Sequence, residues 1–475
     1  MAEAIFIIVN VLLGLALLYC GFALPRRFLY LCAFLLPLQG LGLNVGIFLN
    51  WAKIILPIAL LIRLLRYRNP LRIDSDSPGM RGWLLFFTYI AAITIAHLVL
   101  GTHNDEIRGL ATSWGAAQSE FRLPVQLVGN IASWGVLLVG IWFVRDQRDA
   151  HAAMNGFIAG NVFNALAGFY QLSCPILGLP WLPVSLMNDM TADTGGMYDG
   201  GSMFRLSGIA SEPKHAAAGF VLAIFLLLWA RSSKDFRECT HQYWIKIPIL
   251  GVALLLTLST SGWVAMTVAF TFLVAVNRKW MAWRLPVMVI MLAIAGAIVW
   301  TEDAPGGVVG TIVQEHLIQR VADPGKYEYK EQAFWQFAFD HPEELIFGQG
   351  AGGIDFKLIP YVSSSNLKSK GTISPTYLFD EVLGDFGIVG LFLLIGTVWR
   401  TRSMLIAGGS AEVAQLIGGG SIVALFIPRY ALWGFVLVTG ALIAAHTEQV
   451  AELRQRLFAQ WESWPSEPAH LALPR

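Results

Sequence analysis

The chain has 475 residues, of which 56% are hydrophobic and only 14% are charged. Soluble globular domains carry about 25% charged residues, so this composition excludes a soluble protein and indicates extensive contact with lipid. The formal net charge of +1 gives no basic field that would gather nucleic acid, and we expect no nucleic-acid partner.

Apolar segments long enough to cross a bilayer follow one another along the chain. The first, at 5–23, has neither a basic region before it nor a convincing cleavage site, so we expect a retained span. The pattern predicts an all-α polytopic membrane protein with about twelve to thirteen spans. They lie at 5–23, 28–44, 46–64, 83–100, 124–144, 152–172, 215–230, 246–260, 263–276, 285–300, 377–399, 412–427 and 430–445.

Lysine and arginine are concentrated on alternate connections between these spans. Short loops rich in these residues stay cytoplasmic because they are not translocated. The other connections therefore face outward, the longest being 101–123, 173–214 and 301–376. We predict membrane helices with short loops at 1–300, a large outer loop at 301–376, C-terminal membrane helices at 377–447 and a cytoplasmic tail at 448–475.

The cysteines stand far apart and lack the Cys-x-x-Cys or Cys/His spacing that binds zinc. We expect all of them to pack among apolar side chains, and we predict no metal site and no cofactor. They are Cys20, Cys32, Cys174 and Cys239.

Basic side chains at outward span ends are the first candidates for ligand binding. A cation is costly near lipid, so each must pair, reach the interface or bind an anion. Arg205, Lys214 and Arg429 stand directly at span ends, where a lipid-borne pyrophosphate would meet them, and the arginine fork suits phosphate. For any one of them alone, structural pairing is the more frequent role. Further binding candidates in outward segments are Arg122, Arg320 and Lys330.

The stretch 203–215 holds the candidate general base and leads into a predicted span. Pro213 fits the first turn of a helix, whose free N–H groups favour an anion. Glu212 lies between two cations in a position that we expect to be partly desolvated, where a carboxylate can take a proton. A helix N-cap paired with a neighbouring cation is an equally good interpretation. His215 is a further binding candidate, although packing or capping is its more frequent role.

Two other stretches carry small or polar residues. Small hydroxyl residues at 256–263 indicate close helix approach, or less often a polar wall for sugar hydroxyls. The outer loop predicts an amphipathic helix at 326–335 and a glycine-rich turn at 341–353, which lacks the lysine of a nucleotide loop. Tyr327 is suited either to stacking on a sugar face or to core packing.

Four landmarks follow one another in the order seen in a known family. They are Arg-x-x-Gly with Glu-Pro at 205–213, Thr-x-Ser-x-x-Gly at 257–262, the loop helix with PEELIFGQGAGG at 342–353, and YL…GDFGIVGL at 377–391. Together they resemble the O-antigen ligase/polymerase superfamily, which comprises polytopic enzymes of bacterial surface-polysaccharide assembly. The resemblance covers roughly residues 200–400.

The resemblance implies a fold like the GT-C membrane glycosyltransferases, in the bacterial inner membrane, with an active site facing the periplasm. It also implies that the donor glycan is carried on undecaprenyl pyrophosphate. The further partners that it implies are the bilayer, a chain-length regulator and export machinery. Arg205 matches the arginine that the family assigns to the donor pyrophosphate. Lys330 stands near the place where relatives often carry an arginine.

One departure from the family bears on the reaction. Its ligases carry a His-Asn pair just before the YL span entry, whereas this chain has Ser-Pro-Thr-Tyr at 374–377 and no histidine between His341 and His446. Glu212-Pro213 resembles the polymerase branch instead. We therefore predict a polysaccharide polymerase.

In the predicted reaction Arg205, helped by Lys214 or Arg429, neutralises the leaving pyrophosphate. Glu212 takes the proton of the attacking hydroxyl, and the single displacement inverts the anomeric carbon. The alternatives are an O-antigen ligase that uses another base and transfers the glycan to lipid A-core, or a lipid-linked glycan transporter.

Overall fold

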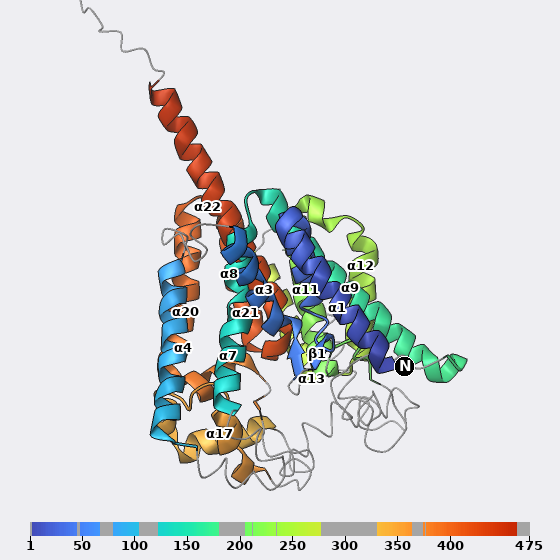
Figure 1. Cartoon of the computed structure of the whole chain (residues 1–475), viewed down its shortest axis with the longest axis vertical. Coiled ribbons are helices and arrows are strands. Elements are labelled where there is room, and N and C mark those ends of the chain that lie inside the picture. Colours follow the sequence, from blue (N-terminus) through green and yellow to red (C-terminus); the bar gives the residue numbers. More distant parts are fainter. Residues whose placement is uncertain are drawn as a thin grey trace, which may run out of the picture.

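Helices make up nearly all of the described structure. The computed structural model describes residues 2–44, 48–66, 79–103, 122–179, 205–210, 212–233, 235–276, 330–362, 374–375 and 377–462. Within these ranges the only sheet is one two-stranded hairpin, and the helices run lengthwise as a bundle (Figure 1). The prediction of an all-α polytopic membrane protein is confirmed.

The elements are given in chain order, with η for a 3₁₀ helix. They are α1 (Ala2–Ala23), α2 (Pro25–Leu35), β1 (Gly42–Asn44), β2 (Phe48–Asn50), α3 (Trp51–Arg66), α4 (Met80–Leu100), α7 (Arg122–Trp134), α8 (Val136–Phe143), α9 (Gln147–Leu177), α11 (Pro213–Ser232), η1 (Arg237–Thr240), α12 (Tyr243–Leu256), α13 (Thr260–Val276), α17 (Lys330–Asp340), η4 (Pro342–Leu345), α18 (Ile354–Lys357), η5 (Ile359–Tyr361), α20 (Leu378–Ala407), α21 (Ala411–Leu425), η6 (Arg429–Ala431) and α22 (Trp433–Glu462).

Four of the described helices are long and apolar enough to cross a membrane. They are Met80–Leu100, Leu123–Phe143 (α7 and α8 taken together), Pro213–Ser232 and Leu378–Ala407. Shorter apolar helices lie at Ile7–Ala23, Tyr243–Leu256, Ser261–Val276, Ala411–Leu425 and Trp433–Thr447. Each of them overlaps a predicted span. The predicted span at 285–300 lies outside the described residues, so the total of twelve to thirteen stays a prediction.

The first departure from the predicted spans lies between α2 and α3. The sequence predicts a span at 28–44, but α2 ends at Leu35 and an antiparallel hairpin of β1 and β2 follows, with Leu43 opposite Leu49. Pro37 lacks the N–H that would continue the helix. Gly42 permits the close pairing, because a Cβ there would lie 2.3 Å from the Leu49 carbonyl oxygen.

Helix α11 lies at the centre of the bundle. Sixteen consecutive residues, His215–Ala230, are buried, and the helix packs against α9, α12, α13 and α21. A helix that is apolar on all sides belongs in such a core. Because the start of α11 is also part of the stretch 203–215, the core fixes one wall of the candidate site.

The two ends of the bundle differ (Figure 1). We call the end that carries α17 the loop end and the end from which α22 projects the tail end. At the tail end Arg26 pairs with Asp146 and Asp149, each at 3.0 Å, and Arg66 donates to the Phe22 carbonyl oxygen at 2.9 Å. The orientation of these ends in a membrane stays a prediction.

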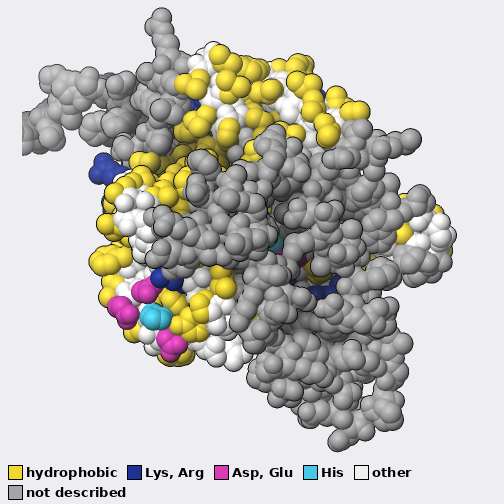
Figure 2. Space-filling view, turned by 60° about the horizontal axis from the view of Figure 1, so that its bottom comes forward, with side chains coloured by type: hydrophobic (Ala, Val, Ile, Leu, Met, Phe, Trp, Pro, Cys, Tyr) yellow, Lys and Arg dark blue, Asp and Glu magenta, His cyan; other side chains and the backbone are white. Residues whose placement is uncertain are grey.

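The loop end carries a small second core. Its buried side chains include Phe334 and Phe337 of α17, together with Ile354 and Leu358, and they pack against Leu383 of α20. Figure 2 brings this end forward and shows hydrophobic side chains over much of the described surface, a small group of acidic side chains beside one histidine, and basic side chains at separate places. The predicted amphipathic helix therefore exists, although it is described from residue 330 to 340 rather than from 326 to 335.

All four cysteines are free. Cys32, Cys174 and Cys239 are buried. Burial raises the pKa of the Cys239 thiol to about 12, which keeps it protonated and unreactive at neutral pH.

Candidate functional site

Helix α20 is broken near the loop end. Gly387 adopts φ 69° and ψ −175°, a conformation that is essentially confined to glycine. A Cβ at this position would lie 2.5 Å from both the Gly348 nitrogen and the Ile346 carbonyl oxygen. The glycine-rich turn at 341–353 therefore packs directly against the break.

This turn satisfies the backbone groups that the break releases. A break in a helix leaves carbonyl and N–H groups unpaired, and inside a membrane protein they must find protein partners. Three backbone hydrogen bonds join the turn to α20: Gln349 N–H to Gly384 O at 2.9 Å, Gly350 N–H to Asp385 O at 2.8 Å, and Val389 N–H to Ile346 O at 3.2 Å. The glycine-rich turn is thus a structural partner of α20.

Polar side chains, some of them buried, hold the same turn from two sides. Asp385, which is 1% exposed, accepts the N–H groups of Gly352 at 2.9 Å and Ile354 at 3.4 Å. Helix α4 and the residues after it contact the turn from the other side, at distances of 2.9 to 3.0 Å. The Tyr89 hydroxyl donates to the Phe347 and Phe386 carbonyl oxygens, and Thr94 Oγ1 accepts the Ala351 N–H. His97 Nε2 contacts the Gly348 carbonyl oxygen and His103 Nε2 contacts the Gln349 carbonyl oxygen. The turn, α4 and α20 consequently form one block.

Arg429 and Glu381 form a buried ion pair beside this block. The guanidinium of Arg429 is 8% exposed and the carboxylate of Glu381 is 10% exposed. Arg429 Nη1 also donates to Asn130 Oδ1 of α7 at 3.2 Å, and Leu378 N–H donates to the Ile427 carbonyl oxygen at 3.0 Å. These bonds join the start of α20 to α7 and to η6.

Two more carboxylates lie near the pair. Asp355, which is 3% exposed, accepts the Ser374 hydroxyl at 2.9 Å, and its charge acts on both Glu381 and Asp385. Carboxylates therefore outnumber the single guanidinium among the described residues around Arg429. The described part of the chain contains no group of three or more acidic, histidine or cysteine side chains arranged to hold a metal ion.

Arg205 lies against the α12–α13 hairpin. Its Nε donates to the Thr257 carbonyl oxygen at 3.0 Å and its Nη2 to the Leu258 carbonyl oxygen at 3.2 Å. A Cβ at Gly262 would lie 2.7 Å from the Ala217 Cβ, so α13 approaches α11 closely. The small residues at 256–263 therefore serve close helix approach in the described structure, and Arg205 is anchored by that hairpin.

Glu212 is more exposed than the sequence suggests. It occupies the N-cap position of α11, without a side-chain capping bond, and pairs with Lys214 at 3.1 Å. The Glu212 side chain is 50% exposed, whereas the expectation was partial desolvation. The alternative interpretation, an N-cap residue paired with a neighbouring cation, describes its position better. His215 is buried at the start of the same helix.

The described residues bring part of the predicted site together. Helix α11 packs against η6, so the elements that carry Lys214 and Arg429 are neighbours at the loop end. Arg122 and Lys330 are the first residues of α7 and α17, and their side chains are outside the description. Arg320 and Tyr327 lie outside the described residues altogether.

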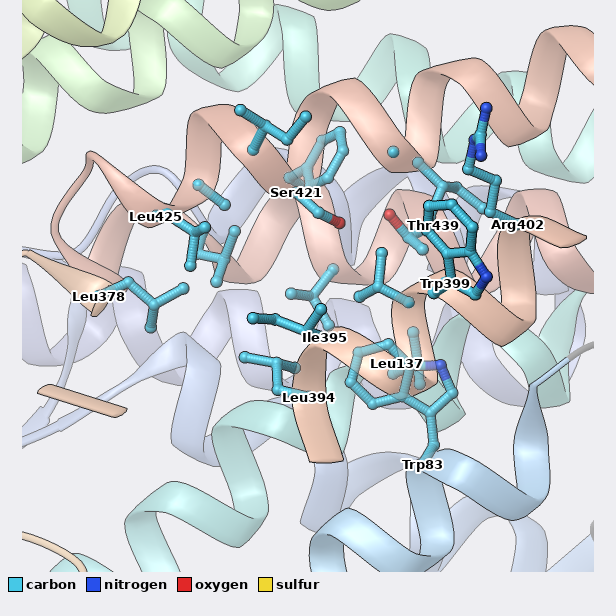
Figure 3. Close-up of a pocket in the computed structure, with 18 of the residues that line it drawn as sticks. Trp83, Leu137, Leu378, Leu394, Ile395, Trp399, Arg402, Ser421, Leu425 and Thr439 are labelled. Carbon is cyan, nitrogen blue, oxygen red and sulfur yellow. The ribbon is translucent and has the colours of Figure 1, made fainter. Parts of the chain in front are cut away.

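An apolar pocket of about 520 Å³ lies between α20, α21 and α22 (Figure 3). Most of its lining is aliphatic or aromatic, and the polar exceptions are Arg402, Gln415, Ser421 and Thr439. Figure 3 shows Leu378 and Leu425 at one end and Arg402 at the other. Leu378 is three residues before Glu381 and Leu432 is three residues after Arg429, so the pocket begins beside the buried ion pair.

Residues 247–395 match a family described as O-Antigen ligase. The predicted resemblance to the O-antigen ligase/polymerase superfamily is confirmed by this match. The matching segment of the O-antigen ligase family begins in α12 and ends in α20, and it includes the α12–α13 hairpin and the glycine-rich turn. No curated protein matches the chain. The match covers 149 of the 475 residues, and together with the apolar helices it supports a multi-pass membrane protein that is similar to the O-antigen ligase family.

Sequence reasoning missed Glu381, Asn130 and Asp355. A signal was present for Glu381, because acidic residues inside an apolar span are costly and usually functional. Asn130 and Arg429 are 299 residues apart in the chain, and no sequence pattern links them.

Proposed function

We propose that this protein polymerises undecaprenyl-pyrophosphate-linked oligosaccharide units into a surface polysaccharide. The observation that carries the proposal is a meeting of three features at the loop end: cationic side chains, buried carboxylates and the start of an apolar pocket. The cationic side chains are Arg205, Lys214 and Arg429. The buried carboxylates are Asp355, Glu381 and Asp385. The apolar pocket begins beside Leu378. In this proposal the loop end faces the periplasm of the inner membrane and 301–376 is a periplasmic loop.

The apolar pocket is suited to the isoprenoid tail of the donor lipid. A tail that lies along α20 leaves its pyrophosphate at the Leu378 end, beside η6. Burial of apolar surface contributes about 25 cal/mol per Å², so the tail supplies much of the donor affinity. The pocket thereby directs the charged group of the donor toward Arg429 and the start of α11.

The start of α11 is suited to the pyrophosphate. Pro213 occupies its first turn, where the positive end of the helix dipole favours an anion. Lys214 and Arg205 add positive charge at the same end of the bundle. Both groups then offset the charge that develops on the leaving pyrophosphate.

The reaction that we propose is a single displacement. An acceptor hydroxyl oxygen of the incoming repeat unit forms a bond with the anomeric carbon of the growing chain as the bond from that carbon to pyrophosphate breaks. The anomeric configuration inverts, and the hydroxyl proton passes to a carboxylate. Because side-chain cations neutralise the leaving group, the proposed reaction needs no metal.

An O-antigen ligase is the second candidate, and the description of the matching family favours it. It would use the same donor but transfer the glycan to a non-polyprenol acceptor such as lipid A-core. The sequence Ser-Pro-Thr-Tyr at 374–377, in place of the histidine-containing ligase motif, favours the polymerase.

Purified protein incubated with the lipid-linked repeat unit alone distinguishes the candidates. We expect a ladder of lengthening chains on a gel, because the polymerase needs no second acceptor. No ladder with the repeat unit alone, followed by transfer once lipid A-core is added, would identify a ligase. No transfer in either mixture would contradict the proposed function.

A further inference from the structure

We propose that Glu381 is the proton acceptor of the transfer reaction and that donor pyrophosphate releases it by drawing Arg429 away from the buried Glu381–Arg429 pair. This inference rests on the proposed function and names a catalytic residue for it. Glu212 was the base expected from the sequence.

The positions of the two acids favour Glu381. Glu212 is 50% exposed and is paired with Lys214 near bulk water. Glu381 is 10% exposed, lies in the first turn of α20 and stands three residues from the pocket-lining Leu378. A base enclosed by protein takes a proton from a hydroxyl without competition from surrounding water.

The partners of Asp385 and Asp355 differ in kind from the partner of Glu381. Asp385 accepts two backbone N–H groups of the glycine-rich turn, and Asp355 accepts the Ser374 hydroxyl. Those partners are part of the protein framework. The partner of Glu381 is a guanidinium, a group that phosphate also binds in a bidentate manner. A pyrophosphate at the end of the pocket therefore competes with Glu381 for the Arg429 guanidinium.

The exchange balances charge and protons. Before the donor binds, Arg429 neutralises Glu381 and is held by Asn130. Donor pyrophosphate takes the guanidinium and leaves a buried carboxylate without its counter-ion. The acceptor hydroxyl then gives its proton to Glu381, its oxygen bonds to the anomeric carbon, and the pyrophosphate leaves as an anion bound to Arg429. The pyrophosphate product diffuses away and the proton returns to water, which restores the pair.

This arrangement also explains how a buried base avoids wasteful chemistry. Without donor, Glu381 remains paired and cannot activate water. The base is available only when the leaving group is in place, so donor binding and proton transfer are linked.

Binding and transfer measured on the same variants test the inference. The probe is undecaprenyl pyrophosphate, titrated into purified full-length protein in nanodiscs. Glu381→Gln keeps the shape of the side chain but removes its charge, so Arg429 becomes available and we expect binding to tighten about tenfold. Transfer by the same variant is expected to fall about 100-fold to 10,000-fold, the usual contribution of a general base.

Arg429→Gln is the opposite variant. We expect it to bind the probe about tenfold more weakly than the wild type, because the exchanged cation is gone. Glu412→Gln is the matched control, since Glu412 accepts the Ser233 hydroxyl at the tail end, and it should keep both binding and transfer. A structural ion pair would instead weaken binding and transfer in parallel for both Glu381→Gln and Arg429→Gln.

The double variant Glu381→Gln with Arg429→Gln guards against misfolding, because it removes both members of the ion pair together and leaves neither of them buried without the other. We expect it to fold, to bind the probe weakly and to lack transfer. Normal transfer by this variant, or unchanged probe binding by folded Glu381→Gln, would overturn the inference.

Different results would contradict the proposed function and the role of Glu381. A wild-type protein that makes no ladder but transfers to lipid A-core is a ligase, and the same variants then test Glu381 in that reaction. A wild type that neither binds the probe nor transfers would contradict both proposals.

Discussion

At the scale of single residues, the site depends on which cations and acids have partners that a ligand can replace. Arg205 is anchored by two backbone carbonyl oxygens, at 3.0 and 3.2 Å. Such anchoring orients a guanidinium without neutralising its charge. Arg429, by contrast, pairs with a carboxylate that a ligand would have to displace.

We expect Arg205→Ala to abolish transfer while the protein still inserts in the membrane and expresses. The loss of one positioned cation typically costs about 100-fold or more in rate. Arg66→Ala is a matched control, because Arg66 also donates to backbone carbonyl oxygens but lies at the tail end. Transfer is measured by the gel ladder. Normal transfer by Arg205→Ala would remove Arg205 from the site.

Glu212→Gln separates the two candidate bases. Since Glu212 is half exposed and its ion pair with Lys214 is of the weak surface kind, we expect transfer to fall by no more than about tenfold. A fall of about 100-fold or more, with normal protein folding, would restore Glu212 as the general base. Lys214→Gln is the companion variant, and we expect it to raise KM for the donor.

At the scale of elements, hydropathy predicted most helices but not their interruptions. The spans that overlap α4, α11 and α20 could be placed because a bilayer imposes a minimum apolar length. Hydropathy could not predict the hairpin at 42–50 or the break at Gly387, since both depend on how backbone groups pair with another segment. The order of the glycines in PEELIFGQGAGG indicated a turn, but not that α20 would supply its partners.

The break in α20 yields a stability prediction with a control in the same helix. We expect Gly387→Ala to destabilise the protein by about 1–3 kcal/mol or more, because its backbone conformation is confined to glycine and a Cβ would meet the turn. Gly396→Ala is the control, since a Cβ there has nothing within 4 Å and alanine favours a helix. Thermal unfolding in detergent measures both variants, and equal midpoints would contradict the importance of the break.

At the scale of the whole molecule, the pocket and the ion pair are assembled from segments far apart in the chain. The pocket takes residues from Trp83 to Thr439, and Arg429 contacts Asn130 of α7. The sequence predicted Arg205, Lys214 and Arg429 as cations at span ends. It could not predict that Arg429 would pair with Glu381, because that contact exists only after the helices pack.

A bulky side chain in the pocket tests whether the tail of the donor lies there. Ser421 points into the pocket (Figure 3). We expect Ser421→Trp to raise KM for an undecaprenyl donor by about tenfold or more and to affect a donor with a three-isoprene tail much less. Gly251→Trp is the control, because a Cβ at Gly251 has nothing within 4 Å. Equal KM changes for long and short tails would place the tail elsewhere.

The contact between the glycine-rich turn and broken α20 has a consequence for building hybrid enzymes. Backbone bonds join residues 346–350 to 384–389, and a carboxylate of the same helix joins 352–354. An outer loop taken from a relative will therefore lack its hydrogen-bond partners on α20 if it is transplanted by itself. The unit of exchange extends from the turn through the first three turns of the following span, and hybrids cut at residue 377 should fail where hybrids cut after 391 succeed.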